Sequence, residues 1–180
     1  MLAAIRFAAR KGTLLGVDPT RVAVGGDSAG ANLALAATLP LRDAEEPLIS
    51  FLLLIYGVYL TNGDSDSWQR LGTGTYGLSR AHLSWIWENY LASPEQRRDY
   101  RVAPLEAKLD GLPPAHLIIG SPDALLDDNH ALAARLGEAG VPHKLTVYEG
   151  INHGFIRYSR LIATARRAIA DCAAALRQAL

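Results

Sequence analysis

The order of apolar and polar residues divides the 180-residue chain into two alternating kinds of segment. One kind is an uninterrupted apolar run, such as "ISFLLLIY" at residues 49–56, which indicates a strand covered on both faces. The other has apolar residues three or four positions apart, which indicates a helix that packs by one stripe. The expected strands cover residues 21–24, 49–56, 115–120 and 144–148, and the expected helices cover residues 5–15, 28–39, 79–91, 128–139 and 162–180. Because strands and helices alternate, the pattern predicts an α/β fold whose parallel sheet of about four strands is flanked by helices.

Prolines, glycines and polar runs mark where these segments are expected to end. The helix at residues 28–39 is expected to stop before Pro40, because proline lacks the N–H group that a helix interior requires. Residues 61–76 are polar and are expected to be irregular. Together with the helix at 79–91 and its loop-rich flanks, they form an expected insertion, residues 61–112, over the body of a single domain, residues 1–180.

Charge and composition narrow the range of partners and compartments. Lysine and arginine total 18, as do aspartate and glutamate, so the net charge is zero and no nucleic-acid partner is indicated. The longest apolar run, residues 48–60, is too short to cross a bilayer, and the first residues lack the pattern of a signal peptide. The lone Cys172 lies on a helical apolar stripe, which favours a core position, and it cannot form an internal disulfide. These features favour a cytoplasmic protein with no membrane span.

The stretch "VGGDSAG" at residues 24–30 offers the first candidate for chemistry. It lacks the lysine of a P-loop and the glycine spacing of a dinucleotide-binding loop, which disfavours a phosphate-binding module. It does match G-x-S-x-G between a strand and a helix, the context of a nucleophile elbow. Gly26 and Gly30 are expected to let neighbouring backbone pass closely, so that a sharp turn presents the Ser28 hydroxyl outward. A glycine-rich turn with an ordinary serine is the alternative.

A serine becomes a nucleophile at neutral pH only with a base, and the base needs an acid to orient it. Asp123 follows the expected third strand and His153 follows the fourth, so both lie at carboxyl ends of strands, as does Ser28. The chain order Ser, Asp, His is that of α/β-hydrolases. Asp127 and Asp128 are rivals for the acid, but they are placed to cap the following helix. The four other histidines are interpreted as surface or packing residues: His82, His116, His130 and His143.

Three stretches closely resemble the hormone-sensitive-lipase-like group of α/β-hydrolase esterases. They are "LGVDPTRVAVGGDSAGANLALA" (residues 15–36), "GLPPAHLIIGSPDALLDD" (111–128) and "YEGINHGF" (148–155). The resemblance implies that Ser28 is the nucleophile, Asp123 the triad acid and His153 the base. It also implies hydrolysis of short-chain acyl esters through an acyl-enzyme, with no metal or organic cofactor. Residues 61–112 resemble part of the family's cap, and Ala124 stands where a proline commonly follows the triad acid.

The resemblance covers nearly the whole chain but only the C-terminal portion of the family, so it implies a truncated α/β-hydrolase fold with a partial cap insertion. The family's upstream strands and its His-Gly-Gly-Gly loop, which supplies most of the oxyanion hole, have no counterpart in the sequence. The Ala29 N–H is then the evident oxyanion donor. The strand at residues 21–24 would become a sheet edge, which predicts a homo-oligomer that covers it. The alternative to an active esterase is a weak or inactive hydrolase fragment that needs a partner or self-association.

Overall fold

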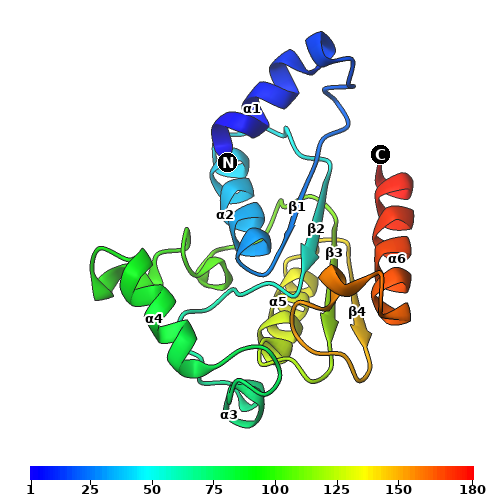
Figure 1. Ribbon diagram of the computed structural model, residues 1–180. Coiled ribbons are helices and arrows are strands. Elements are labelled where there is room, and N and C mark those ends of the chain that lie inside the picture. Colours follow the sequence, from blue (N-terminus) through cyan, green and yellow to red (C-terminus); the bar gives the residue numbers. More distant parts are fainter.

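A parallel sheet forms the centre of the protein (Figure 1), with its strands in the order β1-β2-β3-β4. The computed structural model describes the backbone of residues 1–180 and all side chains except that of Leu15, so the contribution expected from Leu15 to the first helical stripe lies outside the described residues. The strands are β1 (Ala23–Asp27), β2 (Phe51–Ile55), β3 (Ala115–Gly120) and β4 (His143–Tyr148). β3 matches its expected range at both ends, and the other strands begin or end up to three residues away. The predicted α/β fold with a parallel sheet is confirmed.

Helices cover both faces of this sheet. α2 (Ala29–Asp43) and α5 (Leu126–Glu138) pack on one face, and α6 (Ala163–Ala179) packs on the other (Figure 1). Successive residues of a strand point to opposite faces, so Leu117 lies in the core beneath α2 and α5, whereas Ile118 lies in the core beneath α6. This two-sided burial explains why the two central strands, β2 and β3, are largely apolar without alternation.

The remaining helices lie at the two ends of the sheet. They are α1 (Leu2–Lys11), α3 (Asp66–Leu71) and α4 (Arg80–Tyr90), and 3₁₀ turns cover Gly12–Leu15, Pro94–Arg98, Pro104–Glu106 and Phe155–Tyr158. α3 and α4 lie beyond the carboxyl ends of the strands, and α1 lies at the opposite end (Figure 1). That residues 61–112 form an insertion stays a prediction. Within the described part of the chain, no helix is apolar over a length that could cross a membrane.

The prediction that the helix after β1 stops before Pro40 is wrong, because α2 continues to Asp43. Proline in a helix interior costs about 3 kcal/mol. Leu39 and Leu41, on either side of Pro40, are 0% and 1% exposed, and burial of one leucine side chain contributes about 1.5–3 kcal/mol. The Arg42 guanidinium also donates to Lys108 O at 2.5 Å. Tertiary contacts therefore offset the lost backbone hydrogen bond.

The prediction that residues 61–76 are irregular is wrong in part, because α3 lies within them. The Ser65 hydroxyl accepts from the Trp68 N–H at 3.5 Å and caps this short helix. The Trp68 side chain is 1% exposed, so its burial in the core stabilises a turn that is too short to be stable alone.

Candidate active site

Ser28 occupies the sharp turn between β1 and α2. Its φ of +54° and ψ of −117° lie outside the regions that residues with side chains usually adopt, so its backbone is strained. A Cβ on Gly26 would lie 2.5 Å from the backbone carbon of Gly30, so only glycine fits at position 26. The corresponding expectation for Gly30 is wrong, because a Cβ there would meet open space among the described atoms. The Ser28 N–H donates to Ile55 O at 2.8 Å, which fixes the turn to the end of β2.

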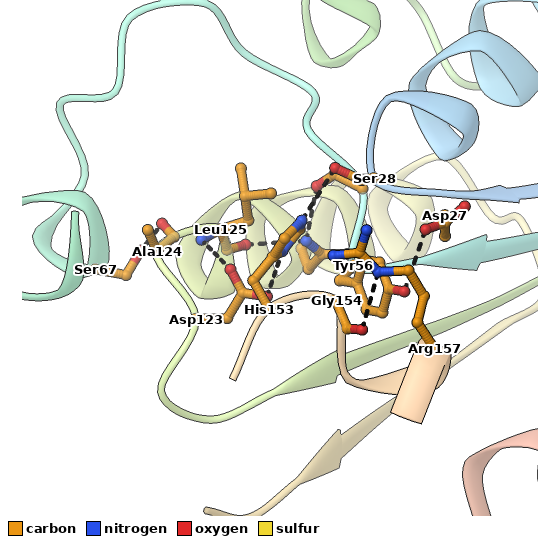
Figure 2. A network of polar contacts seen from close by, with 12 residues as sticks. Asp27, Ser28, Tyr56, Ser67, Asp123, Ala124, Leu125, His153, Gly154 and Arg157 are labelled. Carbon is orange, nitrogen blue, oxygen red and sulfur yellow. Dashed lines mark hydrogen bonds and ion pairs between the residues drawn. The ribbon is translucent and has the colours of Figure 1, made fainter. Parts of the chain in front are cut away.

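The structure brings the three expected triad residues into one hydrogen-bonded chain (Figure 2). His153 Nε2 lies 3.0 Å from Ser28 Oγ, and His153 Nδ1 lies 2.8 Å from Asp123 Oδ2. Because a carboxylate only accepts, Nδ1 carries the proton and donates to Asp123, which leaves Nε2 free to accept from the Ser28 hydroxyl. The fully buried Asp123 also accepts from the Leu125 N–H, through Oδ1 at 2.9 Å. Both of its oxygens are therefore satisfied, and the carboxylate is held in one orientation.

The rival carboxylates lie in the first turn of α5 but neither is its N-cap, so the expectation that they cap this helix is wrong. α5 begins at Leu126, two residues earlier than expected, and the N–H of the preceding Leu125 donates to Asp123. Asp127 Oδ2 accepts from the Ser67 N–H at 2.7 Å, so it caps α3 instead. Asp128 is 3% exposed, and this burial raises the pKa of its carboxyl to about 7, against a smaller lowering by nearby backbone N–H groups.

The four other histidines lie in packing or surface positions. His116 Nε2 lies 2.9 Å from Thr146 Oγ1, and burial lowers the pKa of the His116 imidazole. His143 Nδ1 donates to a backbone carbonyl at 2.9 Å. His82 stacks on a tryptophan ring, and His130 is exposed on α5. Among the described residues, no three His, Cys, Asp or Glu side chains gather closely enough to hold a metal ion.

An apolar pocket of about 180 Å³ opens beside Ser28. Side chains from α2, α3 and α4 line it, among them Leu33, Trp68, Leu83 and Trp87. Two larger hollows, of about 470 and 450 Å³, are lined by residues at the amino ends of the strands, such as Pro114. Since reactive groups of parallel sheets lie at carboxyl ends, the smaller hollow is the one placed for chemistry.

The N-terminus of α2 directly follows Ser28, which is the N-cap residue of this helix. Ala29 is the first residue of α2, and the first N–H groups of a helix have no acceptor within it. The helix dipole adds partial positive charge at the same end, so this position favours an oxygen that gains negative charge.

Two residues near the site were missed in the sequence. Asn32, one turn after Ser28, is 6% exposed, and its Nδ2 donates to Val58 O and Val102 O, both at 2.8 Å. Tyr56 directly follows β2 and is fully buried beside the His153 ring. The sequence did contain a signal for each of them: Asn32 is an amide in an otherwise apolar helix, and Tyr56 is a tyrosine at the carboxyl end of a strand.

A parallel sheet with a serine at a strand-to-helix turn, and with a histidine and an aspartate at two other strand ends, defines the α/β-hydrolase class. Comparison with known families agrees with this assignment. The alpha/beta hydrolase fold family matches residues 1–157, and the chain belongs to this family.

The chain is also similar to curated esterases. It is 33% identical over 183 residues to an ethyl acetate hydrolase of Pseudomonas putida, and the match covers 99% of this chain and 57% of that protein. It is 32% identical over 182 residues to the carboxylesterase NlhH of Mycobacterium tuberculosis, with 99% and 57% covered. The chain thus spans a little over half the length of these relatives.

Solved structures of esterases superpose closely on the chain. The carboxylesterase EstE1, cloned from a metagenomic library, matches with a TM-score of 0.96 and 34% identity, over 99% of this chain and 62% of that one. An esterase of Pyrobaculum calidifontis matches with a TM-score of 0.95 and 30% identity, over 98% and 58%. These similarities confirm the resemblance to the hormone-sensitive-lipase-like group.

Proposed function

We propose that the chain carries the Ser-His-Asp triad of a carboxylic ester hydrolase, with Ser28 as nucleophile, His153 as base and Asp123 as orienting acid. The observation that carries this proposal is the 3.0 Å contact of His153 Nε2 with Ser28 Oγ, continued through Nδ1 to Asp123 Oδ2 at 2.8 Å. This is the geometry in which an imidazole removes a hydroxyl proton.

The proposed reaction has two halves. In the first, Ser28 Oγ attacks the ester carbonyl while its proton passes to His153 Nε2, and Asp123 stabilises the imidazolium that forms. The tetrahedral intermediate expels the alcohol, which takes the proton from Nε2, and an acyl-enzyme remains on Ser28. In the second half, a water molecule loses a proton to Nε2 and attacks the acyl carbonyl. The bond to Ser28 Oγ then breaks, Oγ takes the proton back from Nε2, and the acid leaves. The Ala29 N–H is proposed as one donor to the oxyanion.

The proposed substrates are small esters with short acyl chains. An apolar pocket of about 180 Å³ beside Ser28 has room for a few carbon atoms and favours a hydrocarbon chain over a charged group. The relative named ethyl acetate hydrolase supports the same substrate class.

A weak or inactive hydrolase is the second candidate, because the Ala29 N–H is the one oxyanion donor that the proposal identifies among the described residues. Oxyanion holes use several donors, and loss of one typically slows turnover by about 10²–10³-fold. In this case a partner chain or self-association would supply what efficient turnover needs.

Replacement of Ser28 by alanine tests the proposal. We expect Ser28→Ala to lower kcat/KM for p-nitrophenyl acetate and butyrate by at least about 10³-fold, because no other group replaces the nucleophile. The matched control is Ser84→Ala, at an exposed position on α4, which we expect to stay within about twofold of the unchanged protein.

Labelling separates the two candidates. An organophosphate that modifies Ser28 while ester turnover stays undetectable would favour the weak hydrolase, because the serine would then be activated without an efficient cycle. Equal turnover by the unchanged protein and Ser28→Ala would refute the esterase proposal.

A further inference from the structure

The Tyr56 ring packs against the imidazole of His153. Their ring centroids lie 4.7 Å apart, with the planes at 61°, and Tyr56 makes a second edge contact with Phe155 at 5.6 Å. Edge-to-face contacts of this kind are a favoured geometry for aromatic pairs. Tyr56 therefore touches the loop that carries the proposed base at two points.

The other end of Tyr56 is tied to the nucleophile turn. Its hydroxyl donates to Asp27 Oδ2 at 3.2 Å, and Asp27 immediately precedes Ser28. The residues beside this pair are joined as well, because the N–H of Ser28, which follows Asp27, donates at 2.8 Å to the O of Ile55, which precedes Tyr56. Two successive residues of the turn are thus linked to two successive residues at the end of β2. Figure 2 shows the first of these pairs, Tyr56 and Asp27.

The backbone and the ionisation state of Tyr56 are both fixed. Its φ of +37° is rare for a residue with a side chain, and its N–H donates to Ile118 O at 2.7 Å. Burial and the adjacent Asp27 carboxylate raise the pKa of the Tyr56 hydroxyl, with a smaller opposing effect of Arg157. The hydroxyl therefore stays protonated and remains a donor at neutral pH.

The contacts of His153 show what this arrangement adds. Hydrogen bonds at Nδ1 and Nε2 fix two points of the imidazole, and the ring can still tilt about the line that joins them. A third contact on the ring removes this freedom, and Tyr56 supplies it. A shift of about 1 Å in a reacting group can cost about 10²-fold in rate.

We infer that Tyr56 is a positioning residue. Its ring holds the plane of the His153 imidazole, and the hydrogen bond from its hydroxyl to Asp27 fixes the Tyr56 ring relative to the turn that carries Ser28. The inference rests on the proposed function, because it takes His153 as the base. It assigns a role to the aspartate of "GDSAG" as well: Asp27 anchors Tyr56.

Steady-state kinetics of two Tyr56 variants test the inference. We expect Tyr56→Leu, which removes the aromatic edge, to lower kcat by about 10–100-fold while KM changes by less than about threefold. Tyr56→Phe retains the edge, and we expect kcat within about fivefold of the unchanged protein.

The control is Tyr148→Leu, because Tyr148 is also buried, packs on Phe155 at 5.8 Å and donates its hydroxyl to an aspartate, Asp171. A loss of kcat in Tyr148→Leu equal to that in Tyr56→Leu would overturn the inference.

A measurement that needs no turnover separates this inference from the esterase proposal. In ¹H–¹⁵N spectra of the imidazoles, we expect the unchanged protein and Tyr148→Leu to give His153 signals of one tautomer with the proton on Nδ1. In Tyr56→Leu we expect mixed or exchange-broadened His153 signals. If the unchanged protein hydrolyses no ester, the proposed function fails and these spectra still decide the role of Tyr56. Unchanged His153 signals in Tyr56→Leu would contradict it.

Asp27→Ala keeps the test open if Tyr56→Leu does not fold, because Asp27 is exposed and its loss leaves the core intact. We expect this variant to lower kcat by about 3–10-fold and to broaden the His153 signals. If kcat and the signals are both unchanged, Asp27 does not anchor Tyr56 as inferred.

Discussion

Two buried carboxyl groups near the start of α5 lie in opposite environments. Asp123 receives hydrogen bonds from His153 Nδ1 and the Leu125 N–H, one to each oxygen. Asp128 is buried as well, but its Oδ2 has no hydrogen-bond partner among the described atoms, and its pKa is raised to about 7. Burial disfavours a charge unless partners compensate for the lost water, and the unpartnered Oδ2 leaves part of that cost uncompensated at Asp128.

Asp128 should make the stability of the protein depend on pH. Its pKa is about 7 in the folded chain and 3.8 ordinarily, so between these pH values the folded state binds a proton that the unfolded state has lost. The free energy of unfolding therefore falls as pH rises from about 4 to about 7 and then levels off, by on the order of 4 kcal/mol in total. Asp128→Asn removes this titration, and we expect it to unfold at higher urea than the unchanged protein at pH 8 and with little difference at pH 5.

Asp127→Asn is the control for this measurement. It removes the same charge from the same turn, at a half-buried position that accepts a backbone hydrogen bond an amide oxygen can also accept. We expect it to keep the pH dependence of the unchanged protein. The same flat profile in both variants would exclude Asp128 as the source.

α2 links the nucleophile turn to the segments that cover it. Its first residue follows Ser28, and one turn later Asn32 donates two hydrogen bonds, to Val58 O beyond β2 and to Val102 O before β3. A single amide thus joins three stretches that are far apart in sequence. Because both carbonyls are buried, no water can replace the amide without a rearrangement.

Asn32→Ala should therefore destabilise the fold. It leaves two buried carbonyl groups without a donor, at about 1–3 kcal/mol for each unsatisfied group, so we expect the free energy of unfolding to fall by about 2–4 kcal/mol. Asn89→Ala is the matched control, because Asn89 Nδ2 also donates to a backbone carbonyl, Trp85 O at 2.7 Å, but on the exposed side of α4. We expect a change of no more than about 0.5 kcal/mol there. If urea denaturation showed the same loss of unfolding free energy in Asn32→Ala and Asn89→Ala, burial of the Asn32 hydrogen bonds would not be the source of their stabilising effect.

β1 lies at one edge of the sheet, with β2 as its neighbour. An edge strand presents unpaired N–H and C=O groups, which can pair with a strand of another chain. This edge is the feature that supports the proposed homo-oligomer.

A change of charge at the edge tests that proposal. We expect light scattering coupled to gel filtration to show a dimer or a larger assembly of the unchanged protein, and Ala23→Lys in β1 to shift it toward monomer, because lysine opposes strand pairing. Ala3→Lys, at an exposed position on α1, should leave the assembly intact. A monodisperse monomer of the unchanged protein would contradict the proposal.

Local pattern predicted the strands well and the helix ends less well. The apolar run at residues 49–56 contains β2, because burial on both faces requires apolar residues at every position. α2 extends past Pro40 and α3 forms around Trp68 for reasons that no local pattern contains. Both the extension of α2 and the formation of α3 depend on side chains that become buried against distant segments. This burial outweighs the low helix propensity of each short stretch.

The linear order of residues specified which chemical groups reach the carboxyl ends of the strands, because a serine in G-x-S-x-G, an aspartate and a histidine each come shortly after an expected strand. Three-dimensional packing settled how these groups meet: Ser28 and His153 are 125 positions apart, and their 3.0 Å contact depends on the register of every strand between them. The same packing placed Tyr56 against the His153 ring and left Asp128 without a partner for one oxygen. Burial and hydrogen-bond partners are properties of contacts between distant segments, so they come into existence only when the chain has folded.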